Sequence, residues 1–452
     1  MLCQLVLGLL TANRTVSLLR ESSVYQIENS GQVLKARTKA GASRWSWPRV
    51  SRTVLFLGLT SLFTDISSEM VSTILPLYLV FGLQLTPLAF GVIDGLYLGA
   101  AALVRVVAGV WADRSRRLKE VAVAGYALSA VSRVGLLVAG SVWTALVGIV
   151  LIDRLGKGIR TAPRDALISL SSPQAGLATA FGVHRALDTA GAMVGPLLAF
   201  GLLALTPGSY DAIFVVSLCT ALIGLGILTL FVENQPLPQD DAAAEQPVVS
   251  LRAAAQLVYA PGFGRLLIIG AALGLATMSD GFLYLTLQRR LDFNIGFFPL
   301  LYVATALIFM LLAVPAGRLA DRIGRGRVFV GGYVLLLGVY ALLLLPWLGT
   351  AQVVVSLGLL GAYYAATDGV LMALGSAVLP EELRTSGLAL LTTATSLARL
   401  AASVVFGLLW TWRGLEVAVA VFAVGLLAAM LLTMVVLIRG KVRVSDVQPA
   451  TS

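Results

Sequence analysis

The chain has 452 residues, of which 58% are hydrophobic and only 12% are charged, and its mean hydropathy is +0.90. The few polar side chains cannot cover the surface of a soluble protein of this length. The composition therefore excludes a soluble fold and predicts an all-α polytopic membrane protein. The formal net charge of +10 does not indicate nucleic acid, because we expect the basic residues to gather in connectors on one membrane face.

Cysteine and histidine are too scarce for metal or disulfide chemistry. Cys3 and Cys219 are far apart, and His184 is the single histidine. A disulfide framework, a thiolate metal site or a histidine cluster needs several such residues. We therefore expect neither a metal nor a cofactor.

Residues 1–49 are predicted to be a disordered cytoplasmic tail outside the helical bundle. The apolar stretch 1–10 is too short to cross a membrane, and it lacks the basic start of a signal peptide. A start codon assigned too far upstream would explain this segment equally well.

Twelve apolar segments follow, each about 20 residues or more and therefore long enough to span a bilayer as a helix. We predict two six-helix domains, 50–232 and 263–438, joined by a cytoplasmic linker, 233–262, with a short interfacial helix at 251–259. The predicted spans are 53–81, 88–112, 120–140, 143–168, 176–205, 211–232, 263–290, 297–320, 328–347, 352–379, 386–411 and 415–438.

Basic residues orient these spans. Arginine and lysine are concentrated in the connectors after the second and eighth spans and in the tail 439–452, whereas the connectors after the first, third and ninth spans have none. The positive-inside rule then places both termini and the central linker in the cytoplasm. The two halves therefore have parallel topology.

A short basic turn occurs twice. Gly109, Asp113 and Arg114 begin the first copy, and the second copy has Gly317, Asp321, Arg322 and Arg325. The two aspartates are 321 − 113 = 208 residues apart, which indicates two homologous halves. The second copy reads G-x-x-x-D-R-x-G-R, and the first departs from it with Arg116 at the second glycine.

This turn resembles the cytoplasmic loop signature of the major facilitator superfamily, and the resemblance covers about residues 50 to 440. It implies twelve helices in two pseudo-symmetric six-helix domains, with substrate bound between the domains near the membrane midplane. We hypothesise that Asp113 and Asp321 cap or pair with neighbouring helix ends and hold one conformation closed on the cytoplasmic side.

Charged residues within the spans are the candidate functional groups, because a charge at the bilayer centre costs roughly 2.5–3.5 kcal/mol on insertion scales. Asp65 and Glu69 lie one helical turn apart, as do His184 and Asp188. Other such charges are Lys157, Arg160, Arg164, Asp280, Asp368 and Arg399. The alternative is that these charges are paired and only hold helices together.

Two further patterns resemble family motifs. Arg154-Leu155-Gly156-Lys157-Gly158 is similar to the fourth-helix motif R-x-x-q-G, whose arginine is associated with proton coupling. Gly191, Gly195 and Pro196 match G-x-x-x-G-P, a fifth-helix motif of proton-coupled antiporters, although Ala199 replaces its final glycine. Physically this pattern gives close helix packing and a proline bend, and small-residue packing alone would also explain it.

The coupling site is predicted at Asp65 and Glu69, facing Arg154, with His184 and Asp188 nearby. Two carboxylates one turn apart repel each other when both are ionised, so proton uptake changes how they pair with the arginine. The predicted substrate cavity contains Lys157, Arg160, Asp280, Asp368 and Arg399.

The sequence therefore predicts a secondary transporter, not an enzyme, that works as a monomer in the bacterial inner (plasma) membrane. Its partners would be protons, a small organic substrate and the lipid bilayer. The antiporter motif favours proton-coupled efflux. The basic residues Lys157, Arg160 and Arg164 favour the alternative, uptake or exchange of an anionic metabolite, and a non-transporting membrane sensor is a third hypothesis.

Overall fold

The computed structural model describes the chain from residue 51 to residue 440 with several gaps. The described residues are 51–115, 117–140, 142–172, 177–234, 258–259, 261–291, 293–346, 349–379 and 384–440, and the side chains of 103, 105–115, 177–178, 261, 291, 384–386 and 437–440 are left out. The predicted tails lie outside this part, apart from residues 439 and 440, and so does the predicted interfacial helix except for Val258 and Tyr259.

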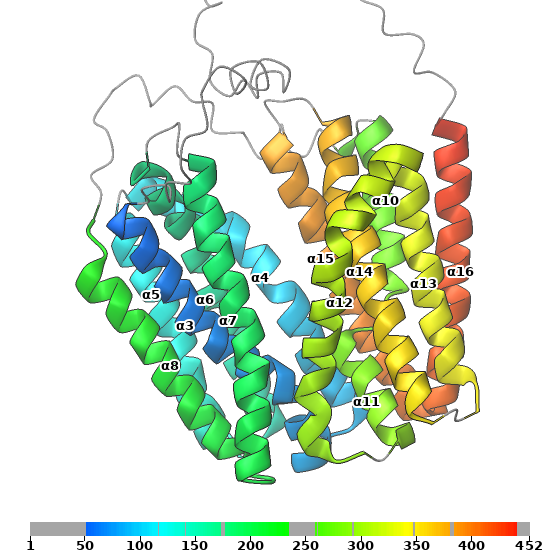
Figure 1. Ribbon diagram of the computed structural model, residues 1–452, viewed down its shortest axis with the longest axis horizontal. Helices are drawn as coiled ribbons and strands as arrows, with labels where there is room; N and C mark the ends of the chain where they lie inside the picture. Colours follow the sequence, from blue (N-terminus) through cyan, green and yellow to red (C-terminus); the bar gives the residue numbers. More distant parts are fainter. Residues whose placement is uncertain are drawn as a thin grey trace, which may run out of the picture. The chain divides into compact units, whose positions relative to one another are not determined.

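Six helices form the first half of the described chain, coloured blue to green in Figure 1. The hydroxyl of Ser51 caps the first of them by accepting a hydrogen bond from the Val54 backbone N–H. The elements are α3 (Arg52–Leu77), the π-helix η1 (Tyr78–Gly82) that continues it, α4 (Pro87–Ser115), α5 (Leu118–Val138), α6 (Trp143–Leu170), α7 (Leu177–Leu205) and α8 (Tyr210–Phe231). The predicted spans are confirmed here, with ends shifted by a few residues.

The second half repeats this arrangement with one difference. Its elements are α10 (Pro261–Leu275), α11 (Asp280–Leu291), the 3-10 helix η4 (Ile295–Phe297), α12 (Phe298–Ile323), α13 (Arg325–Leu344), α14 (Thr350–Val378), α15 (Arg384–Arg413) and α16 (Leu415–Gly440). The predicted span 263–290 corresponds to the candidate membrane span Gly262–Arg290, but residues 276–279 divide it into the two helices α10 and α11.

Side chains stabilise this interruption. Ser279 accepts a hydrogen bond from the Phe282 backbone N–H at 3.4 Å, as a helix N-cap does. The buried hydroxyl of Tyr340 accepts from the Met278 N–H at 2.6 Å and donates to the Ala276 carbonyl at 3.1 Å. Irregular backbone at membrane depth is tolerated only where its polar groups are satisfied or line a cavity, and these bonds meet that condition.

Ten of the described helices are long and apolar enough to cross a membrane by length and composition. The other two spans are α4, whose described apolar part covers 87–102, and α6, which has charged residues throughout its centre. Both pack against other helices, α6 against α4 and α5, and α4 along α15. Within α6, Asp153, Arg154 and Arg164 have ion-pair partners in the protein, which lowers the cost of placing these charges in a membrane.

The two halves meet mainly along α4 and α15, with further contact between α7 and α12. Glycines allow this close approach: a Cβ atom at Gly91 would lie 2.5 Å from the Ser403 carbonyl oxygen, and one at Gly95 would lie 2.8 Å from that of Leu400. Small residues let helix backbones pack this tightly in a membrane.

These contacts lie at one end of the molecule, where α4 begins and α15 ends, opposite the start of α3 and the end of α16 (Figure 1). The Leu88 N–H donates to the Thr411 hydroxyl at 3.0 Å. The ring of Phe282 contacts Phe90 at 4.7 Å and Phe406 at 4.7 Å between ring centroids. Aromatic side chains from both halves thus close this end.

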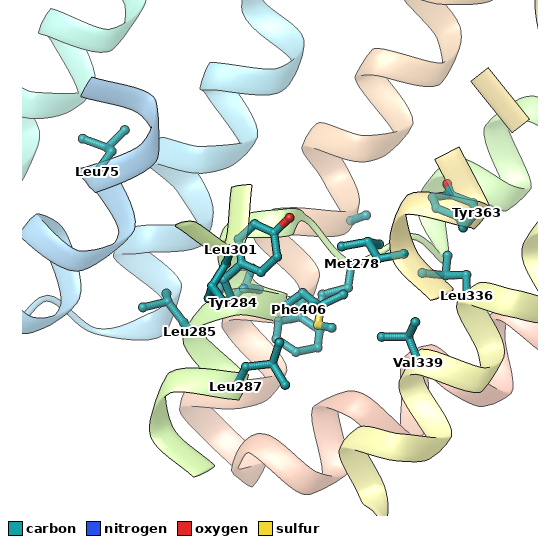
Figure 2. Close-up of a cluster of buried hydrophobic side chains, with 14 of the residues drawn as sticks. Leu75, Met278, Tyr284, Leu285, Leu287, Leu301, Leu336, Val339, Tyr363 and Phe406 are labelled. Carbon is teal, nitrogen blue, oxygen red and sulfur yellow. The ribbon is translucent and has the colours of Figure 1, made fainter. Parts of the chain in front are cut away.

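The largest group of buried apolar side chains extends across the same boundary. Figure 2 shows Leu75 of α3 on the side of the first half, and Tyr284, Leu336, Tyr363 and Phe406 of the second half. All five are at most 5% exposed. The short helix α11 lies among these side chains, next to the contact between the halves.

Candidate functional site

A cavity of about 260 Å³ lies between the halves, next to the aromatic contact of Phe90. The interrupted segment contributes Thr277, Met278 and Ser279 to its wall. The remaining lining residues are Glu69, Ser72, Leu75 and Pro76 of α3, Phe90, Asp94, Tyr97 and Leu98 of α4, Asp280 and Gly281 of α11, Tyr302 of α12, Tyr364 of α14 and Arg399 of α15. Unwound backbone at such a boundary is typical of substrate sites in transporters.

Each acid in this cavity has a hydroxyl partner. Asp280 accepts a hydrogen bond from Tyr364 at 2.5 Å, and its position as the first residue of α11 places its charge at the positive end of a helix. Asp94 accepts from Ser403 of α15 at 2.7 Å. Asp94 of the first half is therefore bonded to the second half.

Glu69 completes the set of three acids, and it accepts a hydrogen bond from Ser72 at 2.8 Å. Arg399 is the single basic residue in the lining. Among the ion pairs of the described residues, none joins Glu69, Asp94 or Asp280 to a basic side chain. Acidic groups in the cavity thus outnumber basic ones by three to one.

A buried ion-pair network lies behind the Tyr97 wall of the cavity. Asp153 of α6 pairs with Arg133 of α5 at 3.1 Å and also with its neighbour Arg154. The guanidinium of Arg154 lies over the Tyr97 ring, 3.7 Å from its centroid, in cation–π geometry. All three charged residues are at most 4% exposed, and breaking such a pair from one side costs about 3–5 kcal/mol.

A second polar cluster joins α3 to α7. The carboxyl groups of Asp65 and Asp188 lie close together, and Lys157 and Arg160 of α6 are the basic residues whose charges act on Asp65. Arg185 donates to Asp188 at 3.2 Å. Two carboxyl groups bond directly only when one of them carries a proton, so this cluster is suited to hold a proton.

His184 is next to that cluster but faces a different partner. Its Nε2 atom is 2.9 Å from the Ser61 hydroxyl, and Ser61 is also 3.4 Å from the Tyr126 hydroxyl. Arg160 lies over the Tyr126 ring, 4.6 Å from its centroid, and donates to Ser129 at 3.3 Å. His184 therefore contacts α3, and Arg160 contacts α5.

The predicted site residues therefore do not form one site but lie in separate parts of the structure. Glu69, Asp280 and Arg399 line the cavity, whereas Lys157, Arg160 and Asp368 are not among its lining residues, and Asp368 is exposed. Arg154 is paired with Asp153, and its predicted partner Asp65 lies beside Asp188.

Sequence reasoning overlooked three residues of these networks. Asp94 and Arg133 are charges within predicted spans, which was the signal that identified the other candidates, so they could have been found in the same way. Tyr97 carried no comparable signal, because its role depends on the guanidinium of Arg154 above its ring.

Glycines of the predicted packing motif lie against α3. A Cβ atom at Gly195 would lie 2.8 Å from the Ile66 carbonyl oxygen and 2.9 Å from Cβ of Glu69, and a Cβ atom at Gly191 would overlap the Leu62 carbonyl. Pro196 follows inside α7. The motif therefore positions α7 against the helix that contains both Asp65 and Glu69.

The second basic turn is partly explained by its geometry. Gly324 has a φ of +104°, which favours glycine, and Asp321 pairs with Arg325 at 3.3 Å on an exposed surface. Gly317 and Arg322 lie in the last turns of α12. The first copy is on α4, where the side chains of Asp113 and Arg114, like the surroundings of Gly109, are outside the described part.

The described residues contain no group of three or more His, Cys, Asp or Glu side chains that could hold a metal ion. The carboxylates of the cavity come with one arginine and several tyrosines. This mixture suits an organic molecule that carries a charge and an apolar part.

Comparison with known proteins adds a family and a fold. The sequence profile described as Major Facilitator Superfamily matches residues 57–312 and 291–451. An uncharacterized MFS-type transporter of Methanocaldococcus jannaschii is 31% identical over 377 residues, which cover 80% of this chain and 89% of that one. An uncharacterized protein of Mycobacterium bovis is 34% identical over 216 residues, covering 47% of this chain and 51% of that one.

Solved structures agree at the level of the fold. A mutant of a nucleoside transporter matches with a TM-score of 0.70 at 16% identity, covering 85% of this chain and 99% of that one. A mutant of a peptide transporter, in complex with sulfate, matches with a TM-score of 0.70 at 14% identity, covering 90% and 98%.

Proposed function

Because the chain belongs to the Major Facilitator Superfamily and is a multi-pass membrane transporter, we propose that it exports a small organic cation in exchange for protons by alternating access. The observation that carries this proposal is the charge of the cavity between the halves. Glu69, Asp94 and Asp280 converge there with one guanidinium, that of Arg399.

Three acids in a small enclosed space favour a positively charged occupant. Ionised carboxylates away from bulk water are stable only beside a cation, or they take up protons. An organic cation supplies the missing charge, and protons supply it when the cation is absent. Substrate and protons then compete for the same groups, which is the requirement for exchange.

The size and walls of the cavity further limit which molecules can be its substrate. Its volume of about 260 Å³ is slightly below that of typical ligand sites, which is about 300–1,000 Å³. Tyr97, Tyr302 and Phe90 provide aromatic faces, and these attract cations as well as apolar groups. A small amine or quaternary cation with an apolar part fits both properties.

The same geometry argues against the alternative, an anionic metabolite. The basic residues that favoured it are engaged elsewhere: Arg160 contacts Ser129 and Tyr126, and Arg164 pairs with Asp165 at 2.9 Å. Lys157 does not line the cavity either. An anion in this cavity would meet one arginine and three acids.

Helix α3 connects the cavity to the proposed proton site. Asp65, in the cluster with Asp188, and Glu69, in the cavity, are one helical turn apart on α3. A movement of α3 that follows proton transfer at Asp65 therefore also moves Glu69. This is the physical connection by which proton binding would change the affinity of the cavity for its substrate.

Transport into proteoliposomes with an imposed pH gradient tests the proposal. Purified full-length protein should move small organic cations against their gradient, driven by protons, and should not move anions of the same size. Asp280→Asn should abolish this transport, while Asp211→Asn, at the exposed start of α8, should leave it unchanged. Gradient-driven transport of anions would support the alternative, and no flux of any compound would support a sensor.

A further inference from the structure

A second and larger cavity, of about 1280 Å³, lies within the second half at the end where α12 turns into α13. Its wall is made by α10, α12, α13, α14 and α16, and it shares no lining residue with the cavity between the halves. This groove is therefore separate from the proposed transport site and needs its own explanation.

The polar part of the groove is basic. Arg265 of α10, with Arg322 and Arg327 at the turn, contributes three guanidinium groups. Asp321 is the single acid among the lining residues, and its carboxylate already pairs with Arg325 at 3.3 Å. The groove thus offers an excess of positive charge at its rim.

The rest of the groove is aliphatic and continues onto the outer surface of the helices. Val334 of α13 and Met434 of α16 line it and are 51% and 41% exposed. Ile269, Val330 and Leu374 form its inner wall. A soluble anion would use the arginines but leave this apolar surface without a partner.

We infer that the groove binds an anionic phospholipid, with the phosphate at Arg322 and Arg327 and an acyl chain along α13 and α16. Guanidinium groups match phosphate geometry, and basic pockets between membrane helices bind anionic headgroups. The groove lies at the end expected to be cytoplasmic, where the leaflet is rich in anionic lipid.

Binding of fluorescent phosphatidylglycerol to the purified full-length protein tests this inference, with fluorescent phosphatidylcholine as the neutral comparison. Phosphatidylglycerol should bind more tightly. Arg322→Gln and Arg327→Gln should each weaken it about fivefold, and the double variant about 25-fold, with little effect on phosphatidylcholine. Arg413→Gln is the matched control, because Arg413 is exposed at the end of α15 that lies away from the groove. This substitution should leave the affinity for both lipids unchanged.

A second variant tests the apolar wall without changing charge. Gly331 lines the groove, and a side chain there would extend into open space, so Gly331→Phe should fill the groove and reduce binding of both lipids. Gly425→Phe on α16, also in open space, should bind lipid normally. Equal affinity of the wild type for both lipids would overturn the inference. Displacement of the lipid by free glycerol 3-phosphate at comparable concentration would also overturn it. Absence of lipid binding would overturn it as well and would indicate that a segment of the chain occupies the groove.

Discussion

At the scale of residues, the two acids of α3 have different surroundings although they are one turn apart. Asp65 lies beside the carboxyl of Asp188, whereas Glu69 accepts a hydrogen bond from Ser72 beside the cavity. Asp65 and Asp188 can bond to each other directly only when one of them carries a proton. Glu69 is placed where it can contact a substrate, so the two acids suit different tasks.

Asp65→Asn should separate exchange from proton coupling. Asparagine can still donate a hydrogen bond to Asp188, but it cannot release a proton. In proteoliposomes the variant should retain downhill substrate exchange and lose accumulation driven by a pH gradient. Asp211→Asn should retain both. Gradient-driven accumulation at the wild-type level in Asp65→Asn would place the coupling proton elsewhere, with Asp94 as the next candidate.

At the scale of elements, the packing of α7 on α3 depends on the absence of side chains. Gly195→Leu should abolish transport, because its side chain would meet the Ile66 carbonyl and Glu69. Gly201→Leu on the same helix enters open space and is the matched control. Both variants should insert into the membrane at similar abundance. Normal coupled flux from Gly195→Leu would show that this contact is not needed for transport.

The interruption between α10 and α11 depends on one hydroxyl group. Tyr340→Phe would leave the Met278 N–H and the Ala276 carbonyl without the partner they now share. Each unsatisfied buried group costs about 1–3 kcal/mol, so the purified variant should unfold at a clearly lower temperature. Tyr210→Phe is the comparison, and equal losses in both variants would contradict a special role for Tyr340.

At the scale of the whole molecule, the structure is closed at the end where α4 meets α15. If transport requires this end to open, a link between Leu88→Cys and Thr411→Cys should stop it, because these positions are already in contact. In a background with Cys3 and Cys219 replaced, a short reducible cross-linker should arrest flux and a reductant should restore it. Each single-cysteine variant should be unaffected, and undiminished flux from the linked protein would contradict alternating closure at this contact.

The sequence by itself determined that this is a membrane protein of twelve spans in two homologous halves, because span length, hydropathy and repeat spacing can be read along the chain without knowing which helices meet. It also predicted the turn at Gly324, whose positive φ favours a glycine at that motif position. Only the tertiary structure decided that Asp65 lies beside Asp188, that Asp153 pairs with Arg133, and that Asp94 reaches the cavity. Each of these depends on which helix faces meet. The interruption at 276–279 depends on Tyr340, which comes from a helix distant in the sequence. Hydropathy along the chain does not indicate such a partner.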